Sequence, residues 1–379
     1  MSDTVFVLGA GFSSNAEMPV QEAIMKNIAS SLRTTAYYKN VLELYSKLFN
    51  IRDKRLLNRI PLEDVFTFLD RSVSNREDIN NLHLDEILHA QASMRKLIAM
   101  ILNKNLKAFA RYDKFAEKRR CYNSFFQNLI NRRKAALAKD EFSIVSLNWD
   151  TIPEYFISSI SRTKRLKRIR VDYTCYDYGY NTRDHIPSIY LKTSKYFNLK
   201  LMKLHGSLNW GYCSSCGRLY VKYSESSPPV FYEKKEAVCK HCSQTNLKRL
   251  MITPTLVKDL NNTHLKMIWH NALMDLQEAK RIVFVGYSFP LADFEFRYIL
   301  TKAIAGSKGK RKKKIRVILY PPNDFKLKYN VSEDEWRKMK WARNLVKERY
   351  NNFFGSHNLK FKNLDAIDFM KDNRQIWDW

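Results

Sequence analysis

The chain has 379 residues, of which 45% are hydrophobic and 13% aromatic, so it carries enough apolar material for a globular protein with a substantial core. Its apolar runs fall short of the roughly 20 residues that span a bilayer, and MSDTVFVLGAGF lacks the features of a signal peptide, so we expect a cytoplasmic protein with no membrane segment. Sixty-six Lys and Arg against 38 Asp and Glu give a net charge of +28, which favours polyanionic partners but does not bear on the fold.

The first predicted element is a short apolar strand over residues 4–8 (TVFVL), and a glycine turn, Gly9-Ala10-Gly11-Phe12-Ser13, follows it. After the turn, EMPVQEAIMKNIASSL is typical of a helix. Glycines in such a turn let backbone amides approach a phosphate at the start of a helix. The third glycine of the dinucleotide-binding fingerprint is absent after Gly11, so this motif alone is a weak signal.

Residues 22–140 are predicted to form a large helical insert. Segments such as LEDVFTFLDRSV and CYNSFFQNLINRRKAAL repeat apolar residues at three- and four-residue spacing, which is the period of an amphipathic helix. Glu63 and Asp64, in the first turn of one of these helices, favour the positive end of its dipole and are assigned no chemistry.

Four further apolar segments are predicted strands, and polar or glycine residues follow each of them. They are residues 142–147, 199–204, 281–285 and 315–320, and 250–252 is a short additional candidate. Buried strands that alternate with helices predict an α/β fold with a Rossmann-like, doubly wound parallel sheet. We expect one main domain over residues 1–330 and a helical C-terminal extension over 331–379. Ligands of such sheets bind at the carboxyl ends of the strands.

Four of the six cysteines form two CxxC pairs, Cys213 with Cys216 and Cys239 with Cys242. The 22 residues between the pairs are close to the spacing of four-cysteine zinc sites, and a reducing cytosol favours metal over disulfides. Four protein ligands leave no open position, so the zinc would be structural. We expect a small zinc ribbon over about 211–248. Coincidental cysteines or a redox pair are the alternatives.

The densest basic runs lie at residues 162–170 (RTKRLKRIR) and 308–316 (KGKRKKKIR). Solvated loops are one interpretation of both runs, and contact with nucleic acid or an acidic protein is the other.

Taken together, GAGFS, SLNWD, HGSLNW before the cysteine pairs, and GYS after a later strand resemble the sirtuin superfamily in sequence, order and position at strand ends. The likeness covers Val5 to Gly11 and most of Ser143 to about Asn323, but neither the insert nor the C-terminal extension. LNWDTIPE and GYSFPLADFEFR are similar to the divergent sirtuin-like domains of bacterial antiphage defence systems, which act as NAD hydrolases. Protein deacylases follow the first glycine turn with Gly-Ile-Pro-Asp-Phe-Arg, and SSNAEMP stands here instead.

The resemblance implies NAD as substrate and a set of site residues. Asn148 and His205 would be catalytic, and Asp150 would bond the nicotinamide carboxamide. The remaining predicted NAD contacts are Gly9, Ala10, Gly11, Ser13, Gly286, Ser288 and, for the adenosine ribose, Asn323. A neutral imidazole with a pKa near ~6.5 can accept a proton at neutral pH, and an amide can hold both a water and a ribose hydroxyl.

Each assignment has a structural alternative. A histidine after an apolar strand is often a core residue with a satisfied ring, Asn148 can cap the helix that follows it, and Asp150 is a good N-cap residue.

Three functions remain open at this level. The first is an NAD glycohydrolase that depletes NAD when triggered, gated by homo-oligomerisation or by a partner in trans, such as a hexameric translocating ATPase or a nucleic-acid-guided protein. The second is an NAD-dependent protein deacylase or ADP-ribosyltransferase. The third is a nucleic-acid-binding scaffold with a decayed nucleotide site, which its net charge of +28 favours.

Overall fold

The computed structural model of the chain describes residues 2–136, 141–161, 169–180, 197–222, 230, 237–245, 247–256, 258, 260–305, 313–320, 331–355 and 358–377. Its centre is a seven-stranded sheet in the order β11-β10-β9-β1-β2-β5-β3, in which every neighbouring pair is parallel. The strands are β1 (Thr4–Leu8), β2 (Phe142–Ser146), β3 (Ile169–Asp172), β5 (Phe197–Lys203), β9 (Arg281–Val285), β10 (Lys314–Ile318) and β11 (Asn358–Lys362).

The central strands are apolar throughout because helices cover both faces of the sheet. On one face Phe6 packs edge-on against Phe125 of α6 (Ala116–Ala135) and Trp377 of α13 (Asn373–Trp377). Phe284 is in register with the neighbouring Val7, so it points to the opposite face, where it packs against Tyr350 of α11 (Glu333–Phe354). The predicted doubly wound parallel sheet is therefore confirmed.

The remaining helices of the body lie between strands or, in the last case, after the final strand. They are α1 (Ala10–Ser14), α7 (Ile152–Ser161), α8 (Thr263–Glu278), α9 (Phe294–Ala305) and α12 (Ala366–Lys371). Helix α7 packs on α6, and α8 packs on α9.

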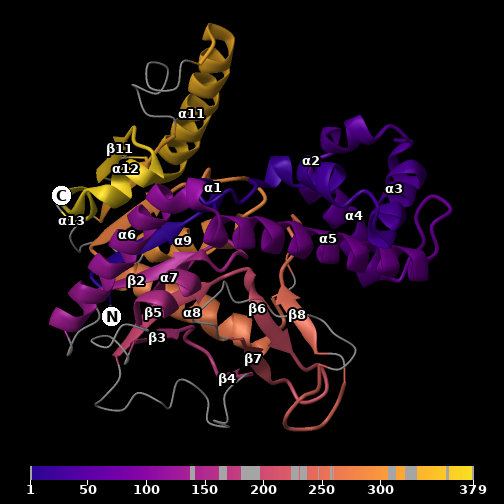
Figure 1. Cartoon of the computed structure of the whole chain (residues 1–379), viewed down its shortest axis with the longest axis horizontal. Coiled ribbons are helices and arrows are strands. Elements are labelled where there is room, and N and C mark those ends of the chain that lie inside the picture. The colour runs from indigo at the N-terminus through magenta and orange to yellow at the C-terminus, as the bar shows by residue number, and fades with distance from the viewer. Residues whose placement is uncertain are drawn as a thin grey trace.

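The helical insert forms a lobe beside the sheet (Figure 1). It contains α2 (Gln21–Ser31), α3 (Ala36–Phe49), the 3-10 turn η1 (Lys54–Arg59), α4 (Leu62–Asn75) and α5 (Leu84–Arg111), and the short turn η2 (Asp113–Phe115) leads into α6. Helix α5 packs against α2, α3 and α4 and runs back to the body as one long rod (Figure 1).

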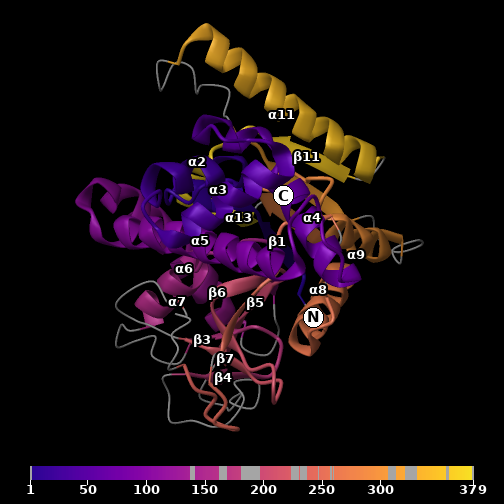
Figure 2. The same ribbon diagram turned by 90° about the vertical axis from the view of Figure 1, so that its right-hand side faces the viewer.

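A second, four-stranded sheet is connected to the C-terminal end of β5. Its order is β4-β7-β6-β8, with β4 (Asp177–Gly179), β6 (Gly206–Tyr212), β7 (Leu219–Val221) and β8 (Lys248–Met251). Figure 2 shows this small sheet at the opposite end of the molecule from α11. Because β6 follows β5 after only two residues, the two sheets are joined directly at the predicted catalytic histidine.

The C-terminal extension differs from the helical expectation in one respect. It contributes β11, which pairs in parallel with β10 and forms an edge of the main sheet. Within the described part of the chain, no helix is both long and apolar enough to cross a bilayer.

Candidate active site

The turns after β1 and β2 meet at the carboxyl edge of the main sheet. The Asn148 side chain donates through Nδ2 to the carbonyl oxygen of Gly9 at 2.8 Å and to Oγ of Ser13 at 3.1 Å. Both hydrogens of that nitrogen are therefore engaged, and Oδ1 is the atom that Asn148 offers as an acceptor to a ligand. Ser13 is buried and lies in α1, directly after the glycine turn.

The turns after β1 and β9 also touch, through their backbones. The Gly11 amide donates to the carbonyl oxygen of Gly286 at 2.8 Å, and the Gly9 amide donates to that of Val285 at 3.0 Å. A Cβ on Gly9 would lie 2.5 Å from Cα of Tyr287, and one on Gly286 would lie 2.1 Å from the nitrogen of Phe12. Only glycine fits at these positions, and Gly286 also has a positive φ of 64°. The amide of Gly11 is thus used inside the protein, and its predicted contact with pyrophosphate stays a prediction.

The His205 ring is buried and held in one orientation. Its Nδ1 lies 3.0 Å from the carbonyl oxygen of Leu147, the residue before Asn148. A carbonyl can only accept, so Nδ1 carries the proton and the neutral ring presents Nε2 as a base. Next to it, Gly206 has a φ of 75°, and a Cβ there would lie 2.2 Å from the carbonyl oxygen of Leu250. The structure therefore places the predicted imidazole against the backbone of the residue before Asn148, at the adjacent ends of β5 and β2.

A charged cluster that the sequence analysis did not single out faces His205. Oδ1 of Asp293 lies 3.6 Å from Nε2 of His205 and 3.0 Å from Nζ of Lys258. The side chains of Asp293 and Lys258 are 13% and 2% exposed, so this ion pair is largely removed from water. Lys258 also contacts Oε2 of Glu295 at 3.4 Å and donates to the carbonyl oxygen of Ala292 at 2.6 Å.

Burial and the charges of the cluster both shift the pKa of His205. Burial lowers the pKa of His205 from its ordinary value of 6.5, the negative charge of Asp293 raises it, and the positive charge of Lys258 lowers it again. Burial dominates, so His205 is a neutral base at physiological pH. For Asp293, burial opposes ionisation, but the positive charges of His205, when protonated, and of Lys258 hold its pKa below the usual value.

Asp150 takes the structural role that the sequence left open. Its Oδ1 accepts from the amide of Ile152 at 3.0 Å, at the start of α7, and its carbonyl oxygen accepts from Nζ of Lys203. Lys203 is fully buried and lies 3.4 Å from Oε1 of Glu154, which also accepts from the hydroxyl of Tyr173 at 3.1 Å. These contacts form a buried polar network that links β5 to α7. The predicted contact of Asp150 with nicotinamide remains a prediction.

The other predicted NAD contacts are less closely connected to His205. Ala10 and Ser288 are exposed, and the carbonyl oxygen of Ser288 accepts from Nη1 of Arg349 at 3.3 Å. Asn323 lies outside the described residues, as do residues 162–168 and 308–312 of the two basic runs.

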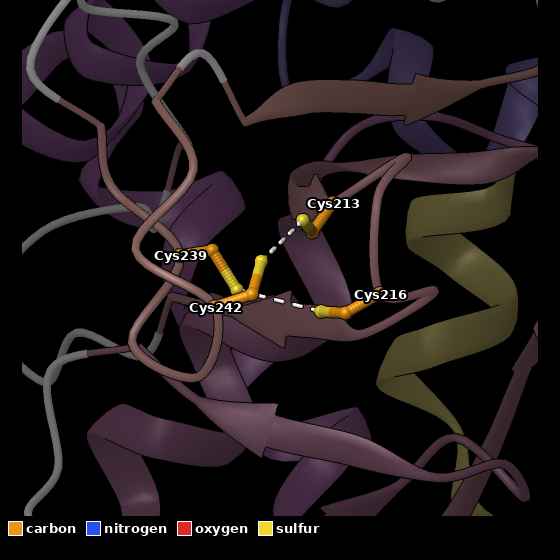
Figure 3. A group of neighbouring side chains, drawn as sticks. All are labelled: Cys213, Cys216, Cys239 and Cys242. Carbon is orange, nitrogen blue, oxygen red and sulfur yellow. Dashed lines mark hydrogen bonds between the residues drawn. The ribbon is translucent and has the colours of Figure 1, made fainter.

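The four cysteines of the two CxxC pairs gather in one cluster (Figure 3). All four Sγ atoms lie within 4.8 Å of one another, with 3.6 Å between Cys213 and Cys242 and 3.5 Å between Cys216 and Cys239. Zinc–sulfur bonds of about 2.3 Å at tetrahedral angles place sulfur atoms about 3.8 Å apart, so the cluster fits a four-thiolate zinc site. Such a site would hold the turns around β6 and β7 together and would have no open coordination position.

Sequence reasoning missed Asp293, Lys258, Lys203 and Glu154. A lysine at the end of an otherwise apolar strand was the available signal for Lys203. Asp293 and Glu295 lie at the start of α9, within the segment GYSFPLADFEFR, and Lys258 lies in a segment without regular structure, so no local pattern distinguished them as site residues.

No protein-family model matches the chain, and no curated protein matches it in sequence. Among solved structures, it is similar to a Sir2 homologue in complex with NAD, with 13% identity, a TM-score of 0.37 and coverage of 92% of this chain and 90% of that one. It is also similar to Sir2Tm bound to a propionylated peptide, with 12% identity, a TM-score of 0.37 and coverage of 98% and 92%. A mutant Sir2 homologue in complex with ADP-ribose has 14% identity, a TM-score of 0.36 and coverage of 92% of each chain. These identities and TM-scores are low, and the function proposed below rests on the residues of this chain.

Proposed function

We propose that this chain is an NAD glycohydrolase that binds NAD at the carboxyl edge of the main sheet and releases nicotinamide and ADP-ribose. The observation that carries the proposal is the pairing of two acceptors at neighbouring strand ends. Nε2 of His205 is set as a base by the hydrogen bond from Nδ1 to Leu147, and Oδ1 of Asn148 is presented by the bonds that its Nδ2 makes.

The reaction requires orientation of the ribose and a nucleophile more than it requires acid catalysis. Nicotinamide leaves from a cationic ring, so the electrons of the breaking bond between C1′ of the ribose and the pyridinium nitrogen return to that nitrogen, and no proton has to be supplied. A water molecule adds to C1′ of the oxocarbenium-like transition state. Its proton passes to Nε2 of His205, directly or through a ribose hydroxyl, while Oδ1 of Asn148 holds its other hydrogen.

The glycine turn would bind the pyrophosphate beside this centre. Ala10 is exposed at the start of α1, and Ser13 lies one turn further, already bonded to Asn148. Gly286 and Ser288 border the same turn from the end of β9. Through these contacts, phosphate binding and the position of Asn148 would be coupled.

Zinc and regulation complete the proposal. We propose that the four-cysteine cluster binds one structural zinc ion. An enzyme that depletes NAD is toxic when unregulated, so we propose a gated effector of antiphage defence, controlled by oligomerisation or by a protein partner in trans. The sequence resemblance supports this biological setting.

A nicotinamide-release assay tests the proposal. Purified chain is incubated with NAD alone, with candidate activators, and with an acyl-lysine peptide. We expect release without peptide, and we expect His205→Ala and Asn148→Ala each to reduce it by about 10²-fold or more while the fold and the zinc content persist. Strict dependence on the peptide would instead identify a deacylase.

A further inference from the structure

Asp293 is fixed by contacts on both of its carboxylate oxygens. It lies just before α9, at the end of the turn that follows β9. Its Oδ2 accepts from the hydroxyl of Tyr287 at 3.0 Å, and its Oδ1 accepts from Nζ of Lys258 at 3.0 Å. An oxygen of a carboxylate can accept more than one hydrogen bond, so Oδ1 keeps capacity on the side that faces His205.

Asp293 does not orient the imidazole in the way that a catalytic-triad aspartate does. The orienting hydrogen bond of His205 is on Nδ1, to Leu147, whereas Asp293 faces the reactive Nε2. At 3.6 Å from Oδ1, Nε2 has no hydrogen-bond partner among the described residues. In the neutral ring, both facing atoms are acceptors. Nε2 meets no donor in the described part of the chain and Oδ1, which accepts from Lys258, can accept once more, so a ligand with two donors can satisfy both.

We infer that Asp293 is a substrate-binding residue, and that its Oδ1 and Nε2 of His205 together receive two adjacent hydroxyl groups of the nicotinamide ribose. The inference rests on the proposed function, whose substrate it describes more closely. It adds an anionic residue from the β9 turn to a centre that otherwise consists of the β2 and β5 ends.

The spacing of the two acceptors favours a diol over a single water. Two cis hydroxyls on neighbouring ring carbons lie about 2.8 Å apart, so two nearly parallel hydrogen bonds reach acceptors separated by 3.6 Å. One water that donates to both would need acceptors about 4.5 Å apart, given hydrogen bonds of about 2.8 Å. A ribose therefore fits this pair better than a bridging water does.

Lys258 keeps the carboxylate of Asp293 negatively charged. Its buried ammonium group keeps Asp293 ionised, and an ionised carboxylate only accepts, so it selects hydroxyl donors and rejects acceptors. Glu295 also balances the charge of Lys258, with Oε2 at 3.4 Å from Nζ and Oε1 bonded to the Lys258 amide.

The test measures how much a single ribose hydroxyl contributes to binding. Binding is followed by titration calorimetry in an Asn148→Ala background, where turnover is slow, with NAD and with analogues that lack the 2′- or the 3′-hydroxyl of the nicotinamide ribose. With Asp293 present, we expect each analogue to bind about 10- to 100-fold more weakly than NAD. With the additional substitution Asp293→Ala, at least one analogue should bind within about 3-fold of NAD.

Matched variants separate recognition from damage to the fold. Glu295→Gln alters the same Lys258 cluster without touching the pair, so it should keep the 10- to 100-fold preference for NAD. Asp293→Glu should restore part of the preference, because it returns the carboxylate. The inference would be overturned if both analogues lost as much affinity relative to NAD in the Asp293→Ala variant as they do when Asp293 is present.

The outcome is separable from that of the proposed function. Nicotinamide release by the chain with Asn148 intact tests hydrolysis, whereas the titrations test only ribose recognition. Asp293-dependent recognition without nicotinamide release would support the inference and reject the hydrolase. Nicotinamide release without Asp293-dependent recognition of the hydroxyls would support the hydrolase and reject the inference. Absence of NAD binding would reject the hydrolase and the inference alike.

Discussion

Nε2 of His205 and Oδ1 of Asp293 face each other at 3.6 Å, and Nζ of Lys258 contacts the same carboxylate oxygen at 3.0 Å. His205 follows β5, Asp293 follows the β9 turn, and Leu147, which follows β2, bonds Nδ1 of the imidazole. The pair therefore connects segments that are far apart in the sequence. Its protonation is therefore the first property to measure.

The acid limb of activity should lie at low pH. Burial lowers the pKa of His205 below its ordinary value of 6.5, so the base stays neutral as the pH falls through 6.5. We expect kcat/KM for NAD to decline only below pH 6.5. Because the charge of Asp293 raises that pKa, Asp293→Asn should move the limb to still lower pH. A limb above 6.5 in the unaltered chain would contradict this prediction.

The same shift predicts a pH dependence of stability. The unfolded chain binds a proton at His205 near pH 6.5, whereas the folded chain does so only at lower pH. The free energy of unfolding should therefore decrease as the pH falls from 6.5 to the folded pKa, and His205→Gln should remove that part of the decrease. Urea unfolding at several pH values measures it.

Gly286→Ala should destabilise the protein far more than Gly217→Ala. Both glycines have positive φ, 64° and 72°, so an alanine is strained at either one. A Cβ at Gly217 meets nothing within 4 Å, but one at Gly286 lies 2.1 Å from the backbone nitrogen of Phe12. We expect losses of about 1 kcal/mol and about 3 kcal/mol or more, respectively, in the free energy of unfolding. Similar losses would show that the two turns can separate freely.

Loss of the proposed zinc ion should destabilise the chain, because Cys213 of the cluster directly follows β6. Cys213→Ser and Cys239→Ser should each remove the single zinc ion expected per chain and lower the free energy of unfolding by about 3 kcal/mol or more. Cys121→Ser is the control, because this thiol lies outside the cluster and bonds the carbonyl oxygen of Glu117. Metal analysis and thermal unfolding provide the readouts. Full stability without zinc would contradict a structural role.

The buried pair of Lys203 and Glu154 should be sensitive to removal of one partner. Lys203→Met leaves an uncompensated carboxyl group that burial already disfavours in its ionised form, as the raised pKa of Glu154 indicates. We expect a loss of about 3–5 kcal/mol in the free energy of unfolding. Adding Glu154→Gln should recover part of it, since the amide still accepts from Tyr173. A double variant as unstable as Lys203→Met would show that the ion pair is not the cause.

The main sheet was predictable because its central strands are continuous apolar runs. TVFVL, FSIVS and RIVFV are such runs, and they form three neighbouring parallel strands. Their hydrophobicity therefore predicted that they would be buried in the sheet. The strand NLKFK was not predicted, since alternating lysines at the edge of a sheet give no continuous apolar signal.

The candidate site was predictable only where short motifs mark strand ends. Asn148, His205 and the glycine turn are adjacent to such ends, and the structure brings them together. Asp293 lies directly before α9 and Lys258 lies in a loop, and the contact between them forms only in the folded chain. The arrangement of these charges could therefore not be read from local pattern.

The contact between Gly9, Gly11 and Gly286 limits how this protein can evolve. The atoms that exclude a side chain there belong to the main chain, which every residue carries, or are Cβ of Tyr287, which every residue except glycine carries. Replacing a bulky neighbour with a smaller one cannot make room, so no second mutation nearby can rescue a change at these three positions. A lineage that loses one of them must rebuild both turns at once.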